Sequence, residues 1–180
     1  PFLRQEPGGP VEQAVLALGG DKQREVRVQV AFSLGEGGTP AVQAAQISML
    51  NAGSGDIFVA DAVLSGLRGR ELATLMALRT DPSWTQSFPG RVRTARLLAQ
   101  CIARARQPDD VARLLSLIAE GSARTVDGGP SLDWSTSTSR VKAALGWMEM
   151  ALLEGLFNAV RFGSLPPIRI NAPPTTFQTL

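Results

Sequence analysis

The side chains that could do chemistry in this chain are carboxylates and arginines, because histidine is absent and cysteine occurs once. The absence of histidine removes the commonest general base and the commonest metal ligand. Four carboxylates, Asp56, Asp61, Glu71 and Asp81, lie close together in the sequence. A paired acid–base site would need two of them buried together, with their pKa values moved apart. Helix caps and solvated faces need no such pairing, and this simpler interpretation predicts no catalytic residue.

No cofactor or metal site is predicted. The single thiol, Cys101, lies in an apolar helical stretch and has no histidine to activate it, so we expect a small buried core residue. The glycine-rich segments 35–38 and 128–129 lack the preceding strand and the spacing of a dinucleotide-binding loop. Both segments are expected to be turns.

Arginines form a second chemical group. Arg93, Arg96, Gln100 and Arg104 are three or four positions apart, so they share one face of a predicted helix. This row could bind an acidic protein surface or a phosphate backbone. The alternative is a solvated face whose arginines pair with nearby carboxylates, namely Asp109, Asp110 and Glu120.

Composition limits the class of protein. The chain has 180 residues, is 44% hydrophobic and 19% charged, and carries a formal charge of only +2. These values predict a globular domain and do not by themselves indicate nucleic-acid binding. No membrane span is expected, because the most apolar stretch, 141–160, contains Lys142, Glu149 and Glu154. Since the chain starts at Pro1, it is expected to be a piece of a longer protein or a processed chain.

The elements that would position these side chains follow a repeat. Val26, Val59 and Val92 each begin a similar nine-residue segment, and they are 33 residues apart. A fixed period of this size is typical of stacked structural repeats. The first segment alternates apolar residues and could also be a strand. Helix is preferred, because the copy at Val92 lies in a stretch rich in arginine, alanine and leucine.

Local signals divide the chain into helices and turns. Thr39, Asp56 and Asp109 are expected to be N-caps, and the pair Gly19-Gly20 suits a left-handed C-terminal cap. Residues 51–55 are expected to form a turn, and 121–138 a long loop. Helices are expected over 11–18, 24–34, 40–50, 57–67, 71–78, 92–105, 111–119 and 140–162.

The last of these helices is the longest and is expected to act as a hydrophobic cap. Its apolar stripe is widened so that two of its sides should be covered; the stripe is Val141, Leu145, Met148, Leu152, Leu156 and Val160, with Trp147, Leu153 and Phe157 beside it. The proline-rich tail from Pro166 cannot be helical and should be extended. Two regions follow: a helical-repeat domain over 1–163 and a tail or linker over 164–180.

The order Asp21, Val26-Arg27, Ala31 and Leu34-Gly35 resembles the second helix of a HEAT-type repeat. This resemblance implies an all-α superhelix, a solenoid of short HEAT-like repeats in which antiparallel helix pairs stack. Ankyrin repeats share the 33-residue period but lack their motif here, and tetratricopeptide repeats lack their signature. A plain irregular helical bundle is the remaining alternative.

A narrower resemblance rests on the motif from Val26 to Gly35, on Val63-Leu64-Ser65-Gly66-Leu67 and on Leu153-Glu154-Gly155-Leu156, and it covers most of residues 21–160. That stretch is similar to the helical-repeat section of large bacterial proteins, from planctomycetes and relatives, that join a β-propeller, HEAT-like repeats and a cytochrome c domain. The resemblance implies a periplasmic location; without it the chain is expected to be cytoplasmic. No haem attachment motif occurs in this chain. Any redox chemistry of such a parent would therefore lie outside it.

Three functions follow from these observations. The first is a non-enzymatic scaffold or protein–protein interaction module, whose partner is another protein or a neighbouring domain of the parent chain. The second is a nucleic-acid-binding helical solenoid that uses the arginine row. The third is an all-α enzyme with carboxylate chemistry at Asp61 or Asp81. The first is favoured.

Overall fold

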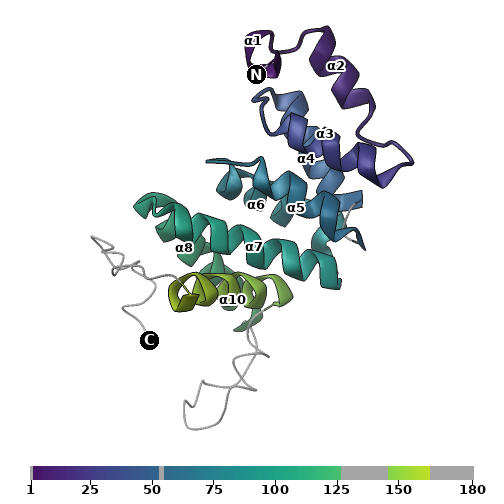
Figure 1. Cartoon of the computed structure of the whole chain (residues 1–180). Coiled ribbons are helices and arrows are strands. Elements are labelled where there is room, and N and C mark those ends of the chain that lie inside the picture. Colours follow the sequence, from purple (N-terminus) through teal and green to yellow (C-terminus); the bar gives the residue numbers. More distant parts are fainter. Residues whose placement is uncertain (1, 53–54, 127–145, 163–180) are drawn as a thin grey trace. The chain divides into compact units, whose positions relative to one another are not determined.

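The computed structural model describes residues 2–52, 55–126 and 146–162, and the regular structure within them is helical (Figure 1). The predicted all-α class is therefore confirmed for these residues. The helices are α1 (Phe2–Gln5), α2 (Pro10–Ala17), α3 (Arg24–Leu34), α4 (Pro40–Ala52), α5 (Ile57–Ser65), α6 (Glu71–Thr80), the 3₁₀ helix η2 (Pro82–Thr85), α7 (Pro89–Ala105), α8 (Pro108–Val126) and α10 (Trp147–Phe162).

The chain divides into two compact units. Unit 1 is Pro1–Thr94 and unit 2 is Ala95–Leu180, so the division falls inside the continuous helix α7. The tail predicted for 164–180 lies outside the described residues, as do 127–138 of the predicted loop and 140–145 of the predicted last helix.

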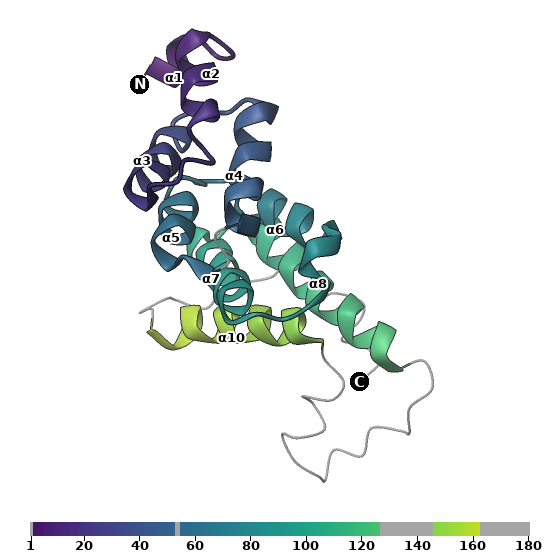
Figure 2. The same cartoon turned by 90° about the vertical axis from the view of Figure 1, so that its right-hand side faces the viewer.

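Unit 1 is built from helices that alternate between two layers. The most extensive contact joins α3 to α5, while α4 packs on α3, α5 and α6, and α2 packs on α3 and α4. Figure 2 shows α3 and α5 on one side of this unit and α4 and α6 on the other. Helices two apart in the sequence are thus neighbours within one layer.

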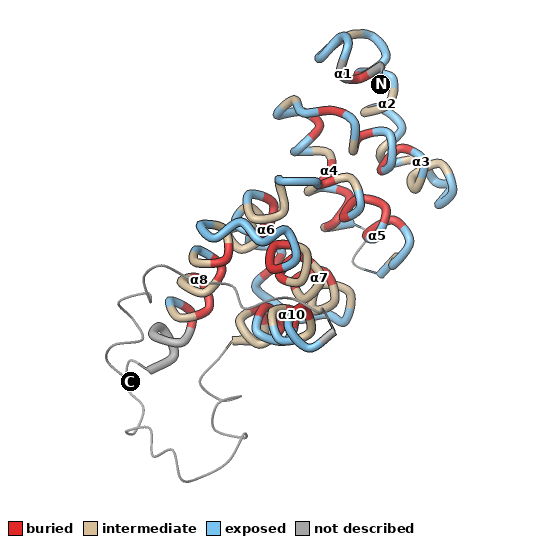
Figure 3. The backbone as a smooth tube through the Cα atoms, turned by 60° about the vertical axis from the view of Figure 1, so that its left-hand side comes forward, coloured by how far each residue is buried: buried red, intermediate tan, exposed pale blue. Residues whose placement is uncertain are grey.

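The apolar periodicity of α3 and α5 explains this contact. Val30, Ala31 and Leu34 are buried on α3, and Val63 and Leu67 are buried on and just after α5. Figure 3 shows buried residues following one another along α5. The segment that begins at Val26 is helical, as predicted, and the strand alternative is wrong. The burial of the repeated valine varies among the three copies. Val59 is buried, whereas Val26 and Val92 are half-buried.

Polar side chains join the layers where helices begin. Asp56 caps α5, because its carboxylate accepts hydrogen bonds from the backbone N–H groups of Phe58 and Val59, as predicted. The same carboxylate pairs with Arg27 of α3 at 3.3 Å. Arg27 also donates to the carbonyl oxygen of Asp21 at 2.8 Å. One arginine therefore connects the turn before α3 to the N-terminus of α5.

Two further connections join α2 to α4 and α4 to η2. Thr39 caps α4 as predicted, accepting from the Val42 N–H at 3.2 Å, and donates to the buried carboxylate of Glu12 at 2.6 Å. The amide of Asn51 donates to Asp81 at 2.7 Å and accepts from the Trp84 indole N–H. Trp84 is buried, so the segment before α7 packs onto the helices.

In unit 2, α10 packs on α8 and crosses its part of α7 at a glycine. A Cβ added to Gly155 would collide with the Arg96 carbonyl oxygen and lie 2.9 Å from the Ala99 Cβ. Arg96 and Glu154 form an ion pair at 3.8 Å beside this crossing. The small residue at 155 therefore sets how closely α10 approaches α7.

Several sequence predictions about turns and caps were wrong. The pair Gly19-Gly20 does not form a left-handed cap: α2 ends at Ala17, its C-cap Leu18 has right-handed geometry, and among the described glycines only Gly8 and Gly69 have positive φ. Asp109 is not an N-cap, because α8 starts at Pro108, where the proline ring already has helical φ. Asp109 lies instead in the first turn, where its charge suits the helix dipole.

Two predicted turns are partly helical. Residues 51–52 extend α4, and residues 53–54 lie outside the described ones. Residues 121–126 extend α8 rather than beginning a loop. Gly121 sits inside this helix and is buried, and a Cβ there would collide with the Glu149 side chain of α10. Packing between α8 and α10 thus explains a helical glycine that the local sequence suggests is a break.

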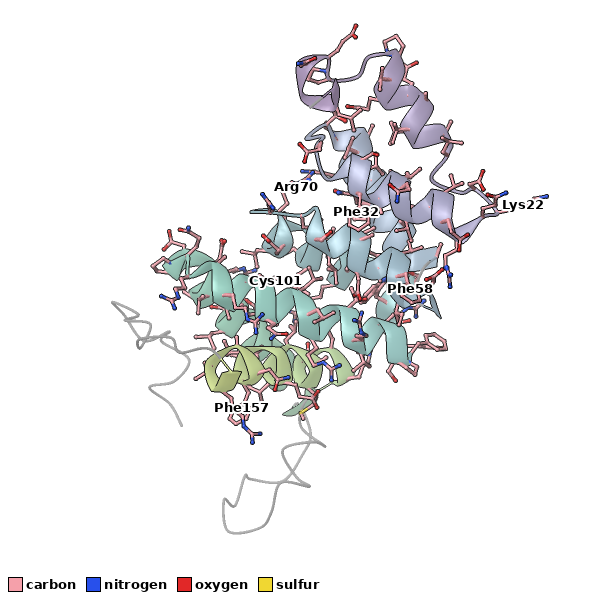
Figure 4. All side chains as sticks on the ribbon, in the orientation of Figure 1. Lys22, Phe32, Phe58, Arg70, Cys101 and Phe157 are labelled. Carbon is pink, nitrogen blue, oxygen red and sulfur yellow. The ribbon has the colours of Figure 1, made fainter. Side chains whose placement is uncertain are left out.

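The apolar stripe predicted for the last helix is wrong in its second half. Met148 and Leu152 are buried, but Val160 is 58% exposed, and Val141 and Leu145 lie outside the described residues. In this half of the helix the buried face is formed by small residues, Gly155 and Ala159, instead of the large apolar residues that were predicted. The second apolar side predicted for this helix is not covered by the described residues either. Phe157 is 60% exposed and lies on the outer side of α10 (Figure 4), and Leu153 is also exposed.

Candidate binding surface

The arginine row predicted on α7 is largely engaged with carboxylates. Arg93 makes two hydrogen bonds to Asp61 of α5: Nη1 donates to Oδ1, and Nη2 donates to Oδ2 at 2.9 Å. These hydrogen bonds raise the pKa of the Arg93 guanidinium above its already high ordinary value, because the bound carboxylate favours the charged form. Arg93 therefore ties α7 to α5 within unit 1.

The other three residues of the row lie in unit 2. Arg96 pairs with Glu154, Gln100 is half-buried, and Arg104 is exposed in the last turn of α7. The carboxylates bound by Arg93 and Arg96 are not the ones that the sequence suggested. Glu120, one of those suggested, binds Arg113 of its own helix at 2.9 Å. Of the row, Arg104 is the exposed member.

The four sequence-adjacent carboxylates serve helix ends and ion pairs. Asp56 caps α5, Asp61 binds Arg93, and Glu71 lies in the first turn of α6. Asp81 caps η2, and hydrogen bonds from Ser83 and then from Asn51 lower the pKa of its carboxyl group. Within the ranges that the structure describes, no group of three or more acidic, histidine or cysteine side chains is placed to hold a metal ion.

Cys101 differs in part from its prediction. It lies within α7, as expected for a helical stretch, but its side chain is half-buried rather than fully buried.

A concave feature of unit 1 lies where α3 and α5 end. It is a cavity of about 640 Å³, which we call the Arg70 cavity. Its wall comes from the turn after α3 and the turn between α5 and α6, together with one side chain of α3. The lining residues are Phe32, Gly35, Glu36, Gly37, Gly38, Ser65, Gly66, Arg68 and Arg70.

Two glycines bring the walls of the cavity together. Gly35 and Gly66 are the C-caps of α3 and α5, and both have ordinary right-handed φ, −59° and −88°. Their glycine identity is explained by contact: a Cβ on Gly35 would lie 2.7 Å from the Gly66 Cα, and one on Gly66 would lie 2.6 Å from the Gly35 Cα. The two backbones touch where any side chain would separate them.

A tight turn then places Arg70 over the end of α5. The backbone N–H of Arg70 donates to the Leu67 carbonyl at 2.9 Å, and Gly69 within this turn has φ +79°. A positive φ at the third residue is that of a type II turn and favours glycine there. The turn therefore returns the chain toward the helix that it has just left.

The guanidinium of Arg70 is held by two backbone carbonyl groups that follow α5. Its Nη2 donates to the Gly66 carbonyl at 3.0 Å and its Nε donates to the Leu67 carbonyl at 3.3 Å. A cation at the C-terminal end of a helix is also favoured by the helix dipole. The third nitrogen, Nη1, is buried and has no hydrogen-bond partner in the part of the chain that the structure describes.

The remaining lining residues give the cavity a mixed character. Phe32 is 51% exposed at its edge, and Figure 4 shows it on the same side of unit 1 as Arg70. Arg68 is exposed and forms no ion pair within the described ranges, whereas Glu36 has a polar partner of its own. Sequence reasoning missed this surface, because it interpreted Gly35–Gly38 only as a turn. The segment Arg68-Gly69-Arg70 was the available signal.

Within the described residues, then, this is an all-α protein of packed helices, and its Arg70 cavity is lined by four glycines, two arginines, one glutamate, one serine and one phenylalanine. No helix in those residues is both long and apolar enough to span a bilayer. Comparison of the chain with protein-family models, curated proteins and solved structures finds no match.

Proposed function

We propose that this chain is a non-enzymatic scaffold or protein–protein interaction module, built from short HEAT-like helical repeats. The observation that carries the proposal is the packing of unit 1, in which α3 lies on α5 while α2, α4 and α6 contact one another in order. Rigid stacks of helix pairs present an extended surface to a partner. Such a surface needs no buried catalytic pair.

The use of charged side chains supports the same function. Asp56 and Arg27 connect helices, Asp61 binds Arg93, and Asp81 closes a turn. A carboxylate that caps a helix or holds an arginine has its lone pairs engaged, and it is poorly suited to accept a proton from a substrate. The enzyme alternative therefore has little support from these groups.

The nucleic-acid alternative is weaker for a related reason. Two of the arginines on which it depends, Arg93 and Arg96, pair with carboxylates. A phosphate backbone would have to displace those carboxylates before it could be bound. Arg104 is exposed, but one arginine neutralises few phosphates.

A peptide-display selection with the full chain tests the proposal. Enriched peptides would be synthesised, and their affinity measured by fluorescence polarisation in parallel with short duplex DNA. We expect peptides to bind with micromolar dissociation constants, a range common for transient contacts. Binding of duplex DNA that weakens steeply between about 50 and about 200 mM salt, with no peptide enriched, would overturn the proposal.

A further inference from the structure

We infer that the Arg70 cavity binds a single carboxylate of a peptide or protein segment, with an apolar side chain next to that carboxylate lying on Phe32. The inference rests on the proposed function and names the partner chemistry of one site. The carboxylate would belong to an Asp or Glu side chain within the segment, or it would be the C-terminal carboxylate of the segment.

The guanidinium of Arg70 is incompletely hydrogen-bonded. Its Nε and Nη2 are engaged with the Leu67 and Gly66 carbonyls, whereas Nη1 is buried without an acceptor in the described residues. A buried donor without a partner is uncommon in folded proteins, and it is costlier when the group is charged. Because Nη1 is buried, an acceptor oxygen of a ligand would reach it only once the guanidinium turned toward the cavity. A carboxylate would then form the stronger charge-assisted hydrogen bond.

The side chains that line the Arg70 cavity carry more positive than negative charge. Arg68 and Arg70 line the cavity together with a single glutamate, Glu36. Two cations and one anion favour a ligand of negative charge. Because two of the three guanidinium nitrogens of Arg70 are already bound, the site offers at most one nitrogen of Arg70 and the exposed head of Arg68. That supply suits one carboxylate better than a doubly charged phosphate group, which Glu36 would also repel more strongly.

Much of the wall of the Arg70 cavity is formed by glycine. Gly35, Gly37, Gly38 and Gly66 contribute no side chains, so a peptide backbone can approach the protein backbone closely there. Phe32 stands at the edge, with half of its surface exposed. A ring in this position offers an apolar surface to a leucine or phenylalanine beside the bound carboxylate, and burial of that surface adds to the affinity.

The test uses C-terminally amidated synthetic peptides with one glutamate flanked by leucine, compared with the same amidated peptides in which glutamine replaces glutamate. Binding to the full chain is measured by fluorescence polarisation. The site is located by NMR through the amide signals of Gly37 and Gly38 and the side-chain Nε–H signal of Arg70. We expect the glutamate peptides to bind at least about tenfold more tightly than the glutamine peptides, since a charge-assisted hydrogen bond is lost.

Substitutions of residues that line the cavity show whether the peptides bind there. Arg70→Gln should weaken binding by about tenfold, and Arg68→Gln and Phe32→Ala each by about threefold. Arg68 and Phe32 are exposed, so their variants keep the fold even if Arg70→Gln loosens the end of α5. Arg104→Gln removes the same charge elsewhere and should leave peptide affinity unchanged.

Other outcomes separate this inference from the proposed function. Peptides that bind equally well to Arg70→Gln, Arg68→Gln and the parent chain would overturn the inference and leave the interaction module in place. Selected peptides that carry no carboxylate would do the same. Phosphopeptides or duplex DNA that bind through Arg70, while glutamate peptides do not bind, would overturn the carboxylate assignment. If no peptide of any composition binds, both the inference and the proposed function fail.

Discussion

The α3–α5 contact of unit 1 and the α7–α10 contact of unit 2 both depend on glycine, but they use it in different places. In unit 1, Gly35 and Gly66 meet backbone to backbone at the ends of the two helices. In unit 2, Gly155 lies within α10 and faces the Arg96 carbonyl oxygen of α7. One contact joins helix ends and leaves a cavity beside the joint, whereas the other lies along the helix length.

The charged groups near the two contacts also differ. Arg27 and Asp56 are 27% and 22% exposed and also complete a helix cap, while Arg96 and Glu154 are 39% and 52% exposed and meet at 3.8 Å. Solvent weakens the second pair much more than the first. The comparison teaches that a polar connection helps to hold the helices together in unit 1. In unit 2, the close approach of the helices contributes more to their association than the ion pair does.

The largest expected effect comes from adding a methyl group at either glycine contact. Gly155→Ala should lower the free energy of unfolding by about 3 kcal/mol and Gly66→Ala by about 2 kcal/mol, because overpacking forces backbones apart. The first is larger, since a helix interior can shift less than a helix end. Urea unfolding of the full chain, followed by circular dichroism, measures both changes.

Gly38→Ala is the matched control, because its added methyl group meets nothing within 4 Å. Its stability should stay within about 0.5 kcal/mol of the parent chain. If Gly155→Ala proved as stable as the parent, as the higher helix propensity of alanine alone suggests, the close α7–α10 contact would be contradicted.

A smaller effect is expected at the polar connection of unit 1. Asp56→Ala removes the N-cap of α5 and the partner of Arg27, and should lower the free energy of unfolding by about 1.5 kcal/mol. Asp56→Asn keeps a capping oxygen but loses the charge, so it should cost about half as much. Equal stability of the two variants in the same urea assay would show that the ion pair, not the cap, carries the contribution.

The smallest effect is expected at the charged pair of unit 2. Arg96→Gln should change the free energy of unfolding by less than about 0.5 kcal/mol, because both side chains are exposed and the pair is long. Added salt should reduce even this difference. A loss above 1 kcal/mol, on the order of a well-formed pair, would mean that the two contacts are stabilised more alike than their geometry indicates.

Several structural features that local chemistry decides were predicted correctly, although the caps expected at Gly19-Gly20 and Asp109 were wrong. Sequence reasoning predicted the bounds of α3, the caps Thr39 and Asp56, and the helical class, because side-chain oxygens and apolar periodicity act within a few residues. It was wrong at Gly121 and along α10, where a neighbouring helix decides which positions are small. HEAT-like repeats and the interaction function remain predictions.

The candidate site shows the same limit. The arginine row on α7 was visible as a spacing, but its engagement with Asp61 and Glu154 depends on two other helices. The Arg70 cavity has no sequence motif that predicts it, since its walls come from turns about 30 residues apart. Arg68-Gly69-Arg70 indicates a turn and does not indicate what lies opposite.

By itself, the amino-acid sequence determined that this chain is helical, where many of its helices begin, and that histidine chemistry is absent. Those properties follow from backbone propensity, capping and composition, which need no distant partner. The tertiary structure alone decided which glycines are contacts, which arginines are paired and which guanidinium lacks an acceptor. These depend on the approach of segments far apart in the chain, and that approach is set by the packing of whole helix faces.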